Sequence, residues 1–74
     1  MTRLPSLTGE QIIKALAKVG FRADRQRGSH VYLEHPDGRA TVIPLHKGES
    51  IGRGLLSKIL RDTDLDRDSF LRLL

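Results

Sequence analysis

The chain has 74 residues, and its 13 lysines and arginines outnumber its 9 aspartates and glutamates, which gives a formal net charge of +4 at pH 7. This length predicts a single domain, residues 1–74, with only a modest hydrophobic core. The absence of cysteine excludes a disulfide framework and a thiolate zinc site, and because no signal peptide or membrane span is recognisable, we expect a soluble, cytoplasmic protein without a membrane partner.

A first helix is predicted to begin near residue 9 and to stop at Gly20. Thr8 is a suitable N-cap, and Gln11 three residues later completes a capping box. Leu7 and Ile12 occupy the positions of a hydrophobic staple across the same helix start. Within the helix, one apolar stripe repeats at helical spacing, formed by Ile12, Leu16 and Val19.

Three strands and two turns are predicted after Gly20. The strands cover Phe21–Arg27, His30–His35 and Arg39–Pro44. Gly28-Ser29 and Pro36-Asp37-Gly38 separate them, and short turns of this kind favour an antiparallel meander.

Two more helices are predicted in the last third of the chain. Ser50 is a candidate N-cap for a helix that runs from about Ile51 or Gly52 to Arg61. A short final helix starts after Asp66 as N-cap, with Leu65 and Phe70 in staple positions. The order predicts an α+β fold, α-β-β-β-α with both longer helices on one face of a three-stranded antiparallel sheet, plus a short C-terminal helix.

Strand alternation places a histidine on the sheet face away from the helices, called the open face below. On the second strand Val31 and Leu33 point to one side, and His30, Tyr32 and Glu34 point to the other. The apolar pair must face the helices, so His30 and Tyr32 lie on the open face. Histidine can accept and donate protons near neutral pH. His30 is therefore either a catalytic candidate or an ordinary exposed residue at a strand end.

Metal and cofactor sites have little support in the sequence. His30 and His35 lie on opposite faces of one strand, so they cannot chelate a metal together. A set of His30, His46 and Glu34 matches no known ligand spacing. Gly52-Arg53-Gly54 lacks the long glycine loop and the lysine of a P-loop, which favours a simple helix start. We expect neither a metal nor a cofactor.

The charge is concentrated in the middle of the chain, where basic residues outnumber acidic ones between Lys14 and Lys58. Residues 61–74 instead alternate arginine with aspartate, as a solvated surface does. A basic centre suits a polyanion, because neutralising its phosphates releases condensed counterions. An ordinary soluble surface with a basic excess is the alternative.

A series of motifs in order along the chain resembles the HicA family of mRNA interferase toxins. The matching segments are Thr8-Gly9-Glu10, Val19-Gly20-Phe21, Arg27-Gly28-Ser29-His30-Val31-Tyr32, Val42-Ile43-Pro44-Leu45-His46, Gly54-Leu55-Leu56-Ser57-Lys58-Ile59-Leu60 and Phe70-Leu71. The resemblance implies a double-stranded-RNA-binding-like fold, endonucleolytic cleavage of mRNA, and neutralisation by a HicB-like antitoxin protein. It also leaves room for a higher-order toxin–antitoxin complex.

The resemblance implies that His30 is catalytic, as general base or acid when a ribose 2′-hydroxyl attacks the adjacent phosphate, a reaction that needs no metal. Gly28 would allow a close backbone turn, and Ser29 would orient the ring or contact a phosphate oxygen. Tyr32 would position a base or the histidine. Phosphate binding falls to the basic residues Arg25, Arg27, Lys47 and Arg53.

Two points stay open at the level of sequence. The second proton-transfer group is either His46 or one of Lys47, Tyr32 and water, since His46 fits a structural turn after Pro44 about as well. Gly54-Leu55-Leu56 stands where the family more often has Gly-Thr-Leu, so a cap or phosphate contact of that threonine hydroxyl is lost here. The alternative function is a non-catalytic double-stranded-RNA-binding-like module that holds RNA or a partner protein.

Overall fold

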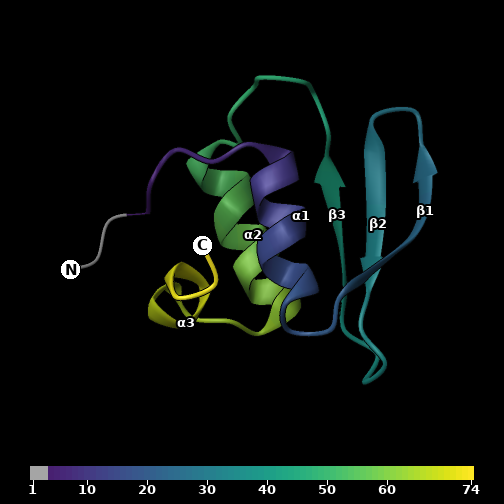
Figure 1. Ribbon diagram of the computed structural model, residues 1–74, viewed down its shortest axis with the longest axis vertical. Coiled ribbons are helices and arrows are strands. Elements are labelled where there is room, and N and C mark those ends of the chain that lie inside the picture. Colours follow the sequence, from purple (N-terminus) through teal and green to yellow (C-terminus); the bar gives the residue numbers. More distant parts are fainter. Residues whose placement is uncertain (1–3) are drawn as a thin grey trace.

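The computed structural model describes residues 4–74 and shows three helices and one sheet (Figure 1). The elements are, in order, α1 (Gly9–Ala17), β1 (Arg22–Arg27), β2 (His30–Glu34), β3 (Ala40–Pro44), α2 (Arg53–Thr63) and α3 (Arg67–Leu71). The sheet is antiparallel with strand order β1-β2-β3. The predicted α+β fold is therefore confirmed. Among residues 4–74, no helix has the length and hydropathy that a membrane crossing needs.

The start of α1 is the capping box that the sequence predicts. Thr8 Oγ1 accepts a hydrogen bond from the Gln11 backbone N–H at 3.3 Å, and Gln11 Oε1 accepts one from the Thr8 N–H at 2.9 Å. Leu7 and Ile12 are both buried, as the staple requires. Two backbone donors are thus satisfied at a helix end that also buries apolar surface.

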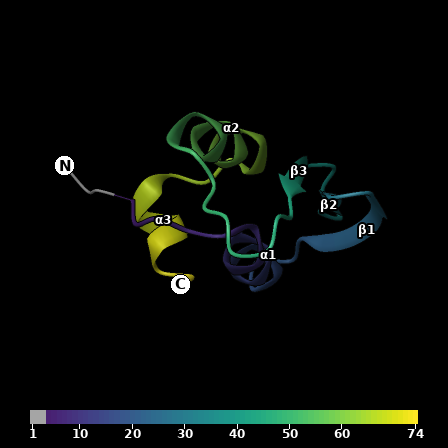
Figure 2. The same cartoon turned by 90° about the horizontal axis from the view of Figure 1, so that it is seen from above.

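One buried cluster holds the helices to the sheet. Figure 2 shows α1 and α2 gathered beside β3, with β1 farthest from them. Val31, Leu33 and Ile43 supply the sheet side of this core. The helices supply its other side with Ile12, Ala15, Leu16, Leu56, Ile59, Leu60 and Phe70. β2, β3 and all three helices therefore share one core. That residues 1–74 form a single domain stays a prediction, and residues 1–3 lie outside the described part.

A β-bulge at Asp24 changes which face the end of β1 presents. The pairing is Ala23 with Leu33 and then Arg25 with Tyr32, so Asp24 is an extra residue on β1. Simple alternation from the buried Phe21 would have turned Arg25 toward the helix side. The bulge instead brings Arg25 to the open face.

The start of α2 differs from the prediction. Its N-cap is Gly52, which offers no side chain for capping. Ser50, the predicted cap, forms an isolated antiparallel bridge with Thr8, and its hydroxyl accepts a hydrogen bond from Ser6 Oγ at 2.9 Å. The prediction was wrong because Ser50 is held extended beside the N-terminal segment. The helix also continues beyond the predicted end at Arg61 and closes at Asp64, whose φ is 55°.

The short helix α3 is confirmed with its predicted cap. Asp66 Oδ1 accepts a hydrogen bond from the Ser69 N–H at 2.7 Å, and this bond lowers the pKa of Asp66 below its ordinary value. Phe70 in the following position is fully buried. The cap therefore sets the direction from which Phe70 enters the core.

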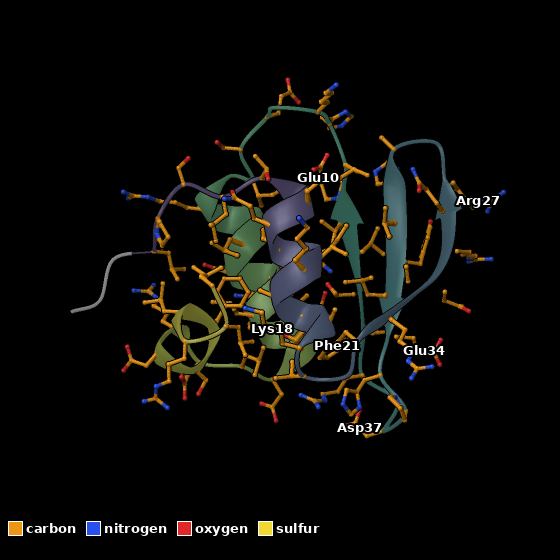
Figure 3. All side chains as sticks on the ribbon, in the orientation of Figure 1. Glu10, Lys18, Phe21, Arg27, Glu34 and Asp37 are labelled. Atoms are coloured by element: carbon orange, nitrogen blue, oxygen red, sulfur yellow. The ribbon has the colours of Figure 1, made fainter. Side chains whose placement is uncertain are left out.

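His35 links the end of α1 to the turn between β2 and β3. Its Nε2 lies 3.0 Å from the Val19 carbonyl oxygen, and its ring centroid lies 5.0 Å from that of Phe21. The Asp37 backbone N–H donates to His35 Nδ1 at 3.1 Å. Figure 3 shows Phe21 and Asp37 at this end of the molecule. His35 thus has a structural role.

Replacing Gly20 with alanine is expected to destabilise the protein by about 2–3 kcal/mol. The Gly20 φ of +99° is strained for alanine, and a Cβ there would lie 2.9 Å from His35 Nε2. Gly38→Ala is a matched control, because Gly38 also has a φ of +99° but nothing within 4 Å of its Cβ position. Urea unfolding should show a larger loss of stability for Gly20→Ala than for Gly38→Ala. Equal losses would mean that the close contact with His35 adds nothing to the effect of the backbone conformation.

Candidate functional site

The open face carries the side chains that the sequence singled out on β2. Val31 and Leu33 are 5% and 1% exposed, and they face the core. His30 is exposed and Tyr32 is half-buried on the other side. The predicted alternation is therefore confirmed. β3 adds Ala40, Val42 and Pro44 to this face, as the partners of Glu34, Tyr32 and His30.

His30 stands at one end of the open face, directly after the β1–β2 turn. Gly28 in this turn has a φ of +58°, which glycine adopts without strain. The turn starts β2 at His30, opposite Arg27 on β1 and Pro44 on β3. None of the hydrogen bonds within residues 4–74 uses the His30 side chain. Both ring nitrogens are therefore accessible for proton transfer with a bound molecule.

Arg25 and Tyr32 form a pair in the middle of the open face. The Arg25 guanidinium carbon lies 4.7 Å from the centroid of the Tyr32 ring. This is a cation–π contact, which is worth about 0.5–1 kcal/mol at an exposed site. The pair limits the movement of both side chains, and Tyr32 lies two residues from His30 on β2.

The loop after β3 begins at the His30 end of the sheet (Figure 1). The Leu45 N–H donates to the Ser29 carbonyl oxygen at 2.6 Å, so the pairing of the two chain segments continues beyond Pro44. His46 and Lys47 follow and are both exposed. The structure thus gathers Ser29, His30 and the start of this loop at one end, and the role of His46 in catalysis stays a prediction.

Arg53 lies apart from this group. It is the first residue of α2 and lines a separate cavity of about 640 Å³. That cavity lies between the N-terminal segment, the start of α2 and α3, where Leu4, Leu56 and Arg67 also line it. Of the basic residues proposed for RNA, Arg25 and Arg27 share the open face, Lys47 lies in the adjacent loop, and Arg53 belongs to another surface.

A hollow of about 350 Å³ lies beyond Tyr32 at the β3 edge of the open face, where α2 borders the sheet, and the sequence did not indicate it. The sheet lines it with Asp24, Arg25, Tyr32, Leu33, Glu34, Ala40, Thr41 and Val42, and α2 adds Lys58 and Asp62. The spacing of Lys58 and Asp62 marks a pair on one helix face. This spacing does not predict that the helix face carrying Lys58 and Asp62 borders the sheet.

The carboxylate of Asp62 is held by two donors. Thr41 Oγ1 and Lys58 Nζ donate to Asp62 Oδ2 at 2.9 Å and 2.8 Å. These bonds, foremost the one from Lys58, lower the pKa of Asp62 below its ordinary value of 3.8. Asp62 is therefore ionised at neutral pH.

Acid is expected to destabilise the protein partly through Asp62. Because the pKa of Asp62 is lower in the folded than in the unfolded chain, its contribution is complete above the ordinary pKa and is lost as the pH falls through the folded value. In urea unfolding between about pH 5 and about pH 3, Asp62→Asn should lose about 0.5–1 kcal/mol less than the native protein. Asp64→Asn, an exposed residue at the end of the same helix, is the control, and identical pH profiles for all three proteins would contradict the prediction.

Histidines and carboxylates are dispersed over the described part of the chain. No group of three or more His, Cys, Asp or Glu within residues 4–74 is arranged to hold a metal ion. His30 and Glu34, two members of the set considered from the sequence, begin and end β2.

The fold and the site define a small α+β protein whose open sheet face presents a histidine beside two arginines. A family model described as the HicA toxin of bacterial toxin–antitoxin systems matches residues 9–65, which is most of the chain. The chain belongs to the HicA toxin family. Membership implies a toxin role and a cognate antitoxin as partner. A comparison with curated proteins found no match.

Proposed function

We propose that this HicA-family toxin is a metal-independent endoribonuclease that cleaves mRNA in the cytoplasm, with His30 as its catalytic residue. The observation that carries the proposal is the exposed imidazole of His30 at the end of the open face, opposite Arg27. His35, by contrast, is engaged in contacts with Val19 and Phe21. His30 is thus the histidine on the face that carries Arg25, Arg27 and Tyr32.

The proposed reaction is an internal transfer of the RNA phosphate. The ribose 2′-oxygen attacks the adjacent phosphorus while a base removes the 2′-hydroxyl proton. The bond from phosphorus to the 5′-oxygen of the next nucleotide breaks, and an acid protonates that oxygen. The products are a 2′,3′-cyclic phosphate and a 5′-hydroxyl. His30 takes one of the two proton-transfer roles, and His46, Lys47, Tyr32 or water takes the other.

The neighbours of His30 would bind the RNA backbone. Arg27 lies directly opposite His30 in the sheet and is suited to stabilise the charge that develops on the phosphate. Gly28 and Ser29 border the same position, and Ser29 is tied through its carbonyl oxygen to the loop that carries Lys47. Arg25 and Tyr32 continue the surface along β2. Arg53 would contact RNA only where the strand extends to the other side of the molecule.

The antitoxin would cover the open face. A HicB-like protein that places acidic side chains over Arg25, Arg27 and His30 would block RNA and gain affinity from complementary charge. Such a cover also stabilises the bound toxin by mass action. We expect a short acidic protein to be encoded next to this one.

The alternative function is a module that binds RNA or a partner protein on the open face without cleaving. The Arg25–Tyr32 pair favours it, because a cation beside an aromatic ring is a common surface for RNA bases. The two functions are separated by incubating the purified protein with mRNA in the presence of a chelator. New ends with a 2′,3′-cyclic phosphate support the endoribonuclease, and binding without new ends supports the module.

A further inference from the structure

We infer that the hollow on the open face is a subsite for one nucleobase of the RNA, and that it prefers bases with an amino group over uracil. This inference rests on the proposed function, because it assumes that RNA lies across the open face. The hollow of about 350 Å³ is at the lower end of the volumes typical of small-molecule sites.

The position of the hollow suits a nucleotide next to the cleaved one. Tyr32 borders the hollow and lies two residues from His30 on the same face of β2. Two strand residues span about 6.7 Å. An extended RNA strand advances by a similar length per nucleotide, so a phosphate at His30 brings a neighbouring base to Tyr32.

The walls of the hollow suit a flat aromatic ring. Arg25 lies over the Tyr32 ring, and Val42 is the partner of Tyr32 on β3. Ala40, two residues before Val42, adds another small side chain to the lining. A base would therefore rest on short apolar side chains beside a tyrosine that Arg25 restrains. Aromatic side chains and arginine guanidinium planes are the usual surfaces on which proteins stack unpaired bases.

The charges around the hollow favour a base rather than a phosphate. Asp24, Glu34 and Asp62 contribute three carboxylates to its lining, against the cations Arg25 and Lys58. A phosphate is better placed at the other end of the open face beside Arg27. Figure 3 shows Arg27 and Glu34 at opposite ends of the sheet.

Asp62 is the group that would distinguish the bases. Thr41 and Lys58 both donate to its Oδ2. Within residues 4–74, no hydrogen bond is made to its Oδ1. The side chain is 26% exposed, whereas that of Lys58 is 59% exposed. Asp62 lines the hollow, and Oδ1 is the carboxylate oxygen that remains available to accept a hydrogen bond from a base. Cytosine offers it an amino group at the position where uracil carries a carbonyl oxygen.

The test compares the binding of short oligocytidylate and oligouridylate of equal length by fluorescence titration. His30→Ala protein is used so that the RNA stays intact. We expect the cytidylate to bind roughly tenfold more tightly. Adding Asp62→Asn should bring the ratio of the two affinities close to one. Adding Asp64→Asn, which removes the same charge outside the hollow, should leave the ratio unchanged. Thermal unfolding of each variant shows whether it is folded.

The outcomes separate this inference from the proposed function. Equal affinities, a preference for uridylate, no binding of either RNA, or a preference that survives Asp62→Asn in a folded protein would each overturn the subsite. Native protein that yields no 2′,3′-cyclic ends would overturn the nuclease function. The absence of cleavage would not affect the subsite, because the subsite is tested by the ratio of the two binding affinities.

Discussion

Replacement of His30 by alanine is expected to slow RNA cleavage by roughly 10²–10⁴-fold, the usual contribution of a positioned acid or base. Because the His30 side chain is exposed and has no hydrogen-bond partner within residues 4–74, the free energy of unfolding should change by less than about 0.5 kcal/mol. RNA binding should also be retained, since Arg25 and Arg27 are unchanged. The measurement is the initial rate of cleavage of a labelled RNA in a chelator.

His46→Ala is the informative comparison, because His46 is exposed in the loop at the same end of the sheet. A loss as large as that of His30→Ala would assign the second proton transfer to His46. A small loss would leave that step to Lys47, Tyr32 or water. Cleavage by His30→Ala at the native rate would exclude His30 from the reaction.

Replacement of Phe70 by alanine is expected to destabilise the protein by about 3–5 kcal/mol. Phe70 is 0% exposed and belongs to the same core as Ile59 and Leu60 of α2. Domains are stable by only about 5–15 kcal/mol, and a chain of this size lies toward the lower end of that range. The variant should therefore be largely unfolded near body temperature. Urea unfolding at a low temperature gives the loss directly.

Two variants separate the effect of burial from that of the helix itself. Phe70→Leu keeps most of the buried volume and should lose clearly less stability than Phe70→Ala. Leu74→Ala removes an apolar residue that is 48% exposed, and it should have little effect. α3 lies outside residues 9–65, the part that matches the family model. A small effect of Phe70→Ala would mean that α3 adds little to the core.

Local chemistry explains why the starts of α1 and α3 were predictable. The Thr8 and Asp66 side chains each satisfy a backbone donor only three residues away, so the interaction is encoded in a few neighbouring residues. Ser50 has the same chemistry but failed as a cap. Its bridge to Thr8 joins segments far apart in the chain, and no local pattern reports such a contact.

The amino-acid sequence by itself determined the order of the elements, the face on which His30 lies and the family to which the chain belongs. These features depend on capping, turns and the two-residue period of a strand, all of which act between near neighbours. The tertiary structure alone decided that the bulge at Asp24 brings Arg25 over Tyr32, and that α2 places Asp62 at the edge of the open face. Both depend on how separate elements pack, because strand register and helix position are set by contacts between distant residues.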